Sequence, residues 1–369
     1  MRSVDPEYVG RMVLGPLHAA SLRAIGEYKG RQEVYMRQSP EALELMRKLA
    51  TIESIESSNR LEGIVARRQR IEGMALRSAR PKGKTEQEIA GYRDALALIH
   101  ERWDSLPFSE EVVRRLHAIL FRYMPEKGGD WKEVDNYIIE RSSDGRERIR
   151  FRPTSARDTP EAMRQLVNRF DELSRRGDDP LLVVPLVVFD FLCIHPFANG
   201  NGRMARLLTL LLLYRSGYIV GRYISLERVF EETKETYYDT LEASSRGWHE
   251  GIHDIMPWLT YFWGVMIRAY REFEARVGTV TTGYGSKTEQ IELAVGRRTG
   301  PFAISDIERE CPGISRDMVR HVLRRLRDEG SISSTGVGRG ARWVKVRGDG
   351  KESRDDDEQA RGESRHRQH

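Results

Sequence analysis

The stretch "IHPFANGNGRMARLLTLLLLY", residues 194–214, interrupts an apolar run with a histidine, a glycine–asparagine turn and two arginines, and then becomes apolar again. The residues that precede it, 180–194, are apolar nearly all round, which predicts a central, buried helix. A second central helix is expected from about Asn201 to Ser216. Two buried helices joined by a polar turn predict a mainly α fold whose core surrounds that turn.

The polar turn has the properties of an anion site. A helix start exposes unpaired N–H groups and the positive end of a dipole, and glycines let a ligand approach the backbone closely. Arg203 and Arg206 lie on one face of the second helix, where two guanidiniums suit a polyphosphate. His195 ends the first helix and has the side chain best suited to accept a hydroxyl proton near neutral pH. Taken singly, these residues would be a core histidine and an ordinary turn; together they indicate base-assisted attack of a hydroxyl on a phosphate.

Composition sets wide bounds on the rest of the chain. Its 369 residues are enough for two or three domains, and 61 basic against 56 acidic residues neither require nor exclude nucleic acid. Cys193 and Cys311 lie in different segments, which favours a reducing compartment over a disulfide framework. The N-terminus lacks the apolar core of a secretory signal, and the apolar run 207–214 is far shorter than the roughly 20 residues of a membrane span. We therefore expect a cytoplasmic protein without a membrane partner.

Periodicity and turn signals predict the remaining elements. Apolar residues recur at helical spacing over 39–62, and further helices are expected over 86–103, 110–121, 159–176, 225–246 and 254–276. Asp144-Gly145, between two runs of alternating polarity, predicts a hairpin over 134–151. The expected divisions are a helical N-terminal region (1–85), a core (86–277), a small-residue linker (278–286), a separate small domain (287–346) and a disordered tail (347–369).

The motif "HPFANGNGRMAR", residues 195–206, resembles the signature of the Fic family, His-x-Phe-x-(Asp/Glu)-Gly-Asn-Gly-Arg-x-x-Arg. The resemblance extends over most of residues 39–277. It implies a Fic-type helical core that transfers AMP from ATP to a Ser, Thr or Tyr hydroxyl of a target protein, or of itself, and releases pyrophosphate. The hairpin over 134–151 resembles the family's flap, which holds the target segment by strand addition; without the resemblance it would be an ordinary surface hairpin.

The resemblance also implies a role for each motif residue. His195 would be the general base, and Phe197 would anchor the loop in the core. The segment "TYYDTLEASS" is similar to the one that borders adenine, where Tyr238 would flank the base, although Ser245 stands where relatives often have Asn and both tyrosines fit plain core packing equally well. The phosphates would be held by Gly200, Asn201 and Gly202 around the α and β positions, by Arg203 at the β position and by Arg206 at the γ position.

Asn199 departs from the family pattern. The family's residue here is Asp or Glu, a ligand of the Mg²⁺ that bridges the phosphates, whereas an amide oxygen ligates a hard cation without contributing charge. We expect Asn199 to be a metal ligand of weakened affinity. The alternative is altered chemistry, either with a different nucleotide or in a site that serves mainly as a ligand sensor.

A second motif lies upstream of the core. "SNRLEG", Ser58 to Gly63, matches the family's inhibitory pattern, (Ser/Thr)-x-x-x-Glu-(Gly/Asn), at the end of the helix predicted over 39–62. By resemblance, Glu62 pairs with Arg206 in the place of the γ-phosphate and leaves ATP bound unproductively. The pattern is short and common, and without the resemblance Glu62 would be a solvated helix-end charge.

The small domain over 287–346 resembles a winged helix-turn-helix. Its wing, around "STGVGRGAR", carries Arg339 and Arg342. These charges suit phosphate contacts on DNA, yet winged helices also serve in dimerisation and protein docking, so DNA, a second copy of the chain and another protein all stay open as partners. The expected recognition helix, 315–329, displays Arg316, Arg320, His321, Arg324 and Arg327.

Three functions follow from these patterns. The first is a protein adenylyltransferase restrained by its own N-terminal helix. The second is a DNA-binding regulator whose Fic core senses nucleotide or has low activity because of Asn199. The third is reversal of the modification, or another nucleotide or phosphate transfer on the same scaffold. Phosphate-transferring relatives carry Ala-Asn-Lys in place of Gly-Asn-Gly, so Gly200 and Arg203 favour AMP transfer.

Overall fold

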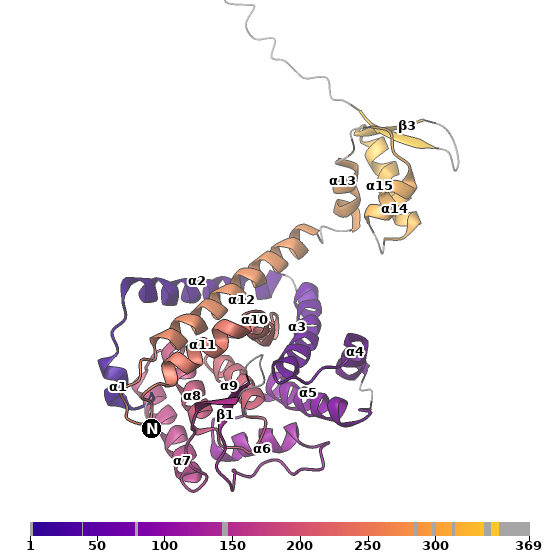
Figure 1. Cartoon of the computed structure of the whole chain (residues 1–369). Helices are drawn as coiled ribbons and strands as arrows, with labels where there is room; N and C mark the ends of the chain where they lie inside the picture. The colour runs from indigo at the N-terminus through magenta and orange to yellow at the C-terminus, as the bar shows by residue number, and fades with distance from the viewer. Residues whose placement is uncertain are drawn as a thin grey trace, which may run out of the picture. The chain divides into compact units, whose positions relative to one another are not determined.

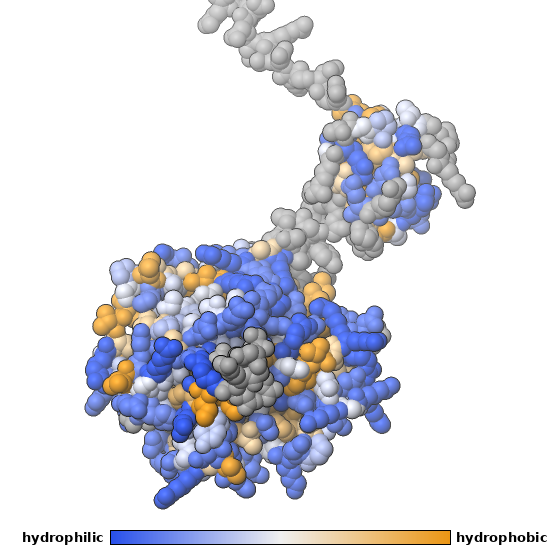
Figure 2. All heavy atoms as spheres, in the orientation of Figure 1, coloured by the Kyte–Doolittle hydropathy of each residue, from blue (hydrophilic) through white to orange (hydrophobic). Residues whose placement is uncertain are grey.

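The computed structural model describes residues 3–38, 40–77, 80–141, 147–283, 287–296, 298, 300–311, 314–335 and 341–346. These residues are mainly helical, as predicted, and the chain divides into two compact units, residues 1–278 and 279–369 (Figure 1). Among the described residues, no helix combines the length and apolar character needed to cross a bilayer. The face of the first unit seen in Figure 2 is mostly hydrophilic, with separate hydrophobic patches.

The first unit is a helical assembly built around two central helices, α8 (Pro180–Ile194) and α9 (Asn201–Arg215). Helices α3, α5 and α6 pack against α9, and α7 packs against α8. The bounds of the other helices are α1 Pro6–Arg11, α2 Pro16–Gln38, α3 Pro40–Leu61, α4 Arg68–Arg77, α5 Lys84–Arg102, α6 Glu110–Leu120, α7 Thr159–Arg176, the 3₁₀ turn η1 Val220–Arg222, α10 Leu226–Glu232, α11 Lys234–Ser245 and α12 Met256–Gly283.

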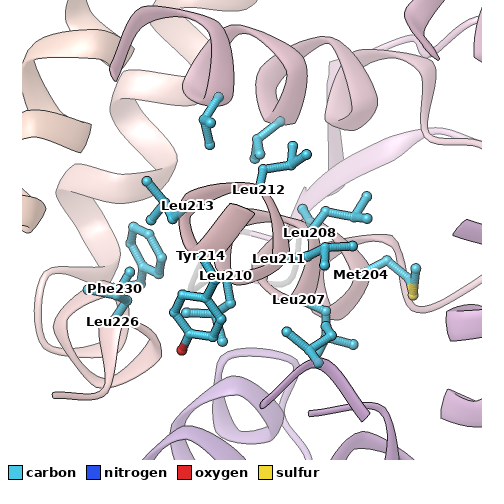
Figure 3. Close-up of a cluster of buried hydrophobic side chains, with 14 of the residues drawn as sticks. Met204, Leu207, Leu208, Leu210, Leu211, Leu212, Leu213, Tyr214, Leu226 and Phe230 are labelled. Atoms are coloured by element: carbon cyan, nitrogen blue, oxygen red, sulfur yellow. The ribbon is translucent and has the colours of Figure 1, made fainter. Parts of the chain in front are cut away.

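The two central helices are buried on all sides, as their sequences predict. The Asp179 side chain caps the start of α8 by accepting a hydrogen bond from the main-chain N–H of Leu181 at 2.8 Å. The labelled leucine side chains of α9 point in different directions (Figure 3), and all of them are buried. Full burial of one such leucine contributes roughly 1.5–3 kcal/mol. The turn between α8 and α9 is therefore anchored at both ends in the buried core of the unit.

The hairpin expected over 134–151 is present. Strands β1 (Ile138–Arg141) and β2 (Glu147–Phe151) pair antiparallel, with Ile139 opposite Ile149 and a bulge beside Ile138. The expected turn at Asp144-Gly145 lies outside the described residues. This hairpin is called the flap below.

The second unit has its own core. Helices α13 (Lys287–Gly296), α14 (Ile304–Glu310) and α15 (Arg316–Asp328) pack together, and strands β3 (Ile332–Thr335) and β4 (Arg342–Lys345) form an antiparallel hairpin. This is the expected order of helices and hairpin, and its identification as a winged helix stays a prediction. Helix α12 runs through 278–283, part of the segment expected to be a linker, while 284–286 and the tail 347–369 lie outside the described residues.

Acidic neighbours neutralise much of the basic surface of α15. Arg316 pairs with Glu308 at 3.5 Å and Arg320 with Asp317 at 3.3 Å. Arg327 pairs with the adjacent Asp328. His321, Arg324 and, on β4, Arg342 are exposed, and Arg339 lies outside the described residues. The positive charge offered to a DNA backbone is thus smaller than the sequence suggests.

Candidate active site

His195 ends α8 in a left-handed conformation, with φ 52° and ψ 59°. Its Nδ1 lies 3.2 Å from the main-chain oxygen of Leu192. Because a carbonyl oxygen only accepts, Nδ1 carries the proton and Nε2 of the neutral ring has an available lone pair. Burial lowers the pKa of His195 to about 4, assisted by the charge of Lys132 and opposed by the Leu192 hydrogen bond and by Glu62. The imidazole is therefore neutral at pH 7 and able to accept a proton.

Phe197 and Asn201 fix the shape of the loop that follows. The buried Phe197 ring stacks on His117, with ring centroids 3.6 Å apart and planes 4° apart. The Asn201 side chain accepts a hydrogen bond from the N–H of Phe197 at 2.9 Å and donates one to its carbonyl at 2.7 Å. We expected Phe197 to be an anchor, but the sequence did not reveal His117 as its partner. The Asn201 side chain is used by the loop, so an anion would meet the main-chain N–H of Asn201.

The first turn of α9 requires its glycines, because neighbouring side chains leave no room there for a Cβ. Gly200 caps the helix with φ +79°. A Cβ on Gly202 would lie 2.3 Å from Oε1 of Glu62, so the Glu62 carboxylate sits directly against the helix start. The N–H groups of Asn201, Gly202 and Arg203 have no acceptor within an α-helix. Negative charge already occupies the anion site that the sequence predicted, and it comes from Glu62.

Arg206 connects the segment Ser58–Gly63 to the cavity. Its side chain is only 2% exposed and donates from Nη2 to Glu62 Oε1 at 2.7 Å. Ser58 receives two further hydrogen bonds, from Nε to its hydroxyl at 2.8 Å and from Nη2 to its carbonyl at 2.9 Å. Burial alone raises the pKa of Glu62, but the charge and hydrogen bond of Arg206, with the charge of Arg203, more than offset it and hold that pKa below its ordinary value. Gly63 follows in a left-handed conformation just after α3 ends.

Arg203 takes a different position from Arg206. It lies outside the set of residues that line the cavity, is 6% exposed, and pairs through Nη2 with Glu88 at 3.2 Å. Its Nε and Nη1 are buried with no hydrogen-bond partner in the part of the chain that the structure describes. Burial also lowers the pKa of Arg203. Unsatisfied buried donors are costly, and an anionic ligand at the start of α9 would supply acceptors.

A cavity of about 660 Å³ connects these groups, within the usual size range for small-molecule sites. His195, the first turn of α9, Glu62 and Arg206 form one part of its wall, and the flap and α11 form the rest. Tyr238 is half-buried at the wall and its hydroxyl lies 3.4 Å from the carbonyl of Leu61. Tyr237, also at the wall, is buried, and Ser245 contributes to the same lining.

Arg150 holds the flap against α11, a contact that the sequence did not reveal. From β2 it donates to Glu242 at 2.7 Å and to the main-chain oxygen of Tyr238 at 3.2 Å. About ninety residues separate these partners in the chain, so no local pattern signals their contact. The flap and the helix that carries Tyr238 are thereby linked.

Asn199 is exposed at the cavity wall, and its main-chain oxygen lies 3.1 Å from Nε2 of His117. Among the described residues, no group of three or more His, Cys, Asp or Glu side chains is arranged to hold a metal ion. The Asn199 amide offers one neutral oxygen, which fits Mg²⁺ only as one ligand beside phosphate oxygens and water.

Comparisons with known proteins agree with this site. Residues 107–213 match the model of the Fic/DOC family. The chain is 30% identical over 112 residues to the protein adenylyltransferase fic-1 of Caenorhabditis elegans and 26% identical over 137 residues to that of Caenorhabditis briggsae. These matches cover 30% and 37% of this chain, but only 20% and 24% of the relatives' length. The chain thus carries a Fic family domain that includes the turn from His195 to Arg206.

Solved structures show the same fold. A Fic family protein from Desulfovibrio desulfuricans aligns with a TM-score of 0.62 at 21% identity, over 92% of this chain and 98% of that one. A Fic-domain signalling protein from Bacteroides thetaiotaomicron gives 0.57 at 21% identity, over 69% and 98%. Fic-1 of Caenorhabditis elegans gives 0.56 at 19% identity, over 72% and 74%.

Proposed function

We propose that this protein is an adenylyltransferase that transfers AMP from ATP to a Ser, Thr or Tyr hydroxyl of a target protein and of itself. The observation that carries the proposal is the arrangement of one cavity wall, where His195, the first turn of α9 and Arg206 lie together. The names of the two nematode relatives support the same activity.

The chemistry follows from the positions of these groups. Nε2 of His195 accepts the proton of the target hydroxyl as its oxygen forms a bond to the α-phosphorus. The bond from that phosphorus to the bridging oxygen breaks, and pyrophosphate leaves with the bonding electron pair. The N–H groups of the first turn of α9, together with Arg203 and Arg206, stabilise the negative charge that develops. Mg²⁺, held by the phosphates and Asn199, would neutralise further charge when bound.

The flap supplies the surface for the target. As a two-stranded sheet it has unpaired main-chain groups along its edges, where an extended segment adds as another strand. The side chains of Ile139 and Ile149 are exposed by about half, and Ile139 also lines the cavity. A target segment on this edge would present its hydroxyl next to His195.

Glu62 restrains this activity in the proposed function. Its carboxylate occupies the position at Arg206 that the terminal phosphate of ATP needs, and two anions do not share one buried guanidinium without a large electrostatic cost. ATP would then bind with its triphosphate displaced, away from the geometry for attack at the α-phosphorus. The substitution Glu62→Gly removes this carboxylate, so a comparison of its turnover with that of wild type tests the restraint.

Labelled ATP tests the reaction itself. Wild type and Glu62→Gly are incubated with ATP labelled at the α- or the γ-phosphorus, and label bound to protein is measured. We expect label from the α position alone. Label from the γ position would instead indicate phosphate transfer, and no label from either would favour a nucleotide-sensing regulator.

Asn199→Asp should lower the Mg²⁺ concentration needed for half-maximal labelling, about tenfold, because a carboxylate adds charge to a neutral ligand. The measurement is a Mg²⁺ titration of α-label incorporation in the Glu62→Gly background. Ala198→Ser, which changes the adjacent exposed residue of the same loop, is the control. An unchanged metal dependence in Asn199→Asp would refute the role of Asn199 as a ligand.

DNA binding by the second unit stays a prediction. Three of the four arginines named on α15 pair with acidic neighbours, and nothing in the described part of that unit favours DNA over a protein partner. A second copy of the chain likewise stays a prediction.

A further inference from the structure

The turn that carries His195 is held in an unfavourable conformation. Among the described residues, His195 is the only non-glycine residue with a positive φ. It also precedes Pro196, which favours an extended backbone in the residue before it. Left-handed backbone is unfavourable for a residue with a Cβ, so the surrounding structure must stabilise this turn.

Two residues of the loop between α6 and β1 supply that stabilisation. Lys132 donates from its main-chain N–H to the carbonyl of Pro196 at 2.8 Å and from Nζ to that of Ile194 at 3.1 Å. Asn136 donates from Nδ2 to the carbonyl of Phe197 at 3.0 Å and, with a long contact of 3.5 Å, to that of His195. Every main-chain carbonyl from Ile194 to Phe197 therefore accepts a hydrogen bond from this pair.

The pair is itself a rigid unit. Nζ of Lys132 also donates to Oδ1 of Asn136 at 2.8 Å, so each side chain fixes the other. Lys132 is only 4% exposed, and its burial lowers its pKa to about 8. A buried lysine that satisfies two acceptors next to a strained turn has a more specific role than a surface charge.

We propose that Lys132 and Asn136 are positioning residues that clamp the left-handed turn and thereby aim Nε2 of His195 at the reacting hydroxyl. The inference rests on the proposed function for its effect on rate. Its main effect falls on His195, because among the described residues Lys132 and Asn136 make no hydrogen bond to Arg203 or Arg206 and reach Asn201 only through the shared carbonyl of Phe197. Loss of the clamp should therefore lower kcat and leave the KM for ATP nearly unchanged.

Two substitutions in the Glu62→Gly background test the clamp. Lys132→Met removes both the side-chain donor and its charge at similar length. Asn136→Asp removes the amide donor, keeps an acceptor oxygen for Lys132 and adds a negative charge. Each should lower kcat for self-labelling about a hundredfold, since small displacements of a catalytic group cost that much, with the KM for ATP within about twofold. Lys127→Met is the matched control, an exposed lysine in the same loop. Asn136→Asp tests the clamp even where Lys132→Met does not fold.

NMR of the His195 ring gives a readout that needs neither nucleotide nor target. The Nδ1 proton bonded to Leu192 should give a protected signal in the parent, assigned by its loss in His195→Asn, and that signal should disappear in both clamp variants. The pKa of His195 should also rise in Lys132→Met, because a neighbouring positive charge is removed. Absence of labelling in every variant, Glu62→Gly included, would refute the proposed function. The NMR measurement would still test the clamp, because it does not depend on activity. A kcat within about twofold of the parent, or an unaltered His195 signal, would refute the clamp.

Discussion

Glu62→Gly should raise self-labelling from α-labelled ATP roughly 10- to 100-fold over wild type. The substitution removes the carboxylate that Arg206 holds at 2.7 Å and frees the guanidinium for the terminal phosphate. A hydrogen bond to a charged group contributes roughly 1.5–3 kcal/mol, and each 1.4 kcal/mol changes an equilibrium tenfold. The measurement is the initial rate of label incorporation at saturating ATP and Mg²⁺.

Glu56→Gly is the matched control for this substitution. Glu56 lies on α3, the helix that ends just before Glu62, and pairs with Arg60 and Arg68 rather than with a residue of the cavity. Glycine inside a helix costs about 1 kcal/mol at Glu56, whereas Glu62 follows the end of α3, so the control weakens the helix at least as much while it keeps the Glu62 carboxylate. Equal labelling by wild type and Glu62→Gly, or equal activation by Glu56→Gly, would contradict restraint by Glu62.

His195→Asn in the Glu62→Gly background should reduce labelling by at least a hundredfold, because a positioned general base contributes about 10²- to 10⁴-fold. Asparagine is chosen because it tolerates left-handed backbone, so the loop keeps its shape while the base is lost. His195→Ala should abolish labelling as well. ATP binding, measured separately, should persist, since the phosphate-binding groups of α9 are unchanged.

Two comparisons sharpen this second prediction. His249→Asn changes a histidine that is hydrogen-bonded to the carbonyl of Arg152 outside the cavity, and it should leave labelling unchanged.

The rate constant for labelling at low ATP should not change with pH across the neutral range in Glu62→Gly. His195 takes up a proton only as the pH falls toward its pKa of about 4, and removal of Glu62 lowers that pKa further. Labelling by His195→Asn at the parental rate would remove the proposed base.

The sequence predicted the central helices and the meeting of the turn with the inhibitory motif. Residues 180–194 and 207–214 are apolar nearly all round, so burial is their stable arrangement. The approach of Glu62 to Arg206 was expected from the Fic resemblance alone, because no periodicity relates residues so far apart in the chain.

Other features depend on contacts that no local pattern records. His117, Lys132, Asn136 and Arg150 fix the loop and the flap through partners brought close only by the fold. The pairing of Arg203 with Glu88 is of the same kind, and it places this arginine off the cavity wall. The sequence identifies these residues as polar or charged, but their partners depend on how the helices pack in the folded chain.

Helix α3, Glu62 just after its end, and the cavity that Glu62 restrains in the proposed function belong to one compact unit of the chain. In the proposed function, opening within a monomeric chain is a first-order event, and its equilibrium does not depend on how much protein is present. Dilution would leave the fraction of open molecules unchanged, and an activator would have to bind this chain and contribute free energy of its own.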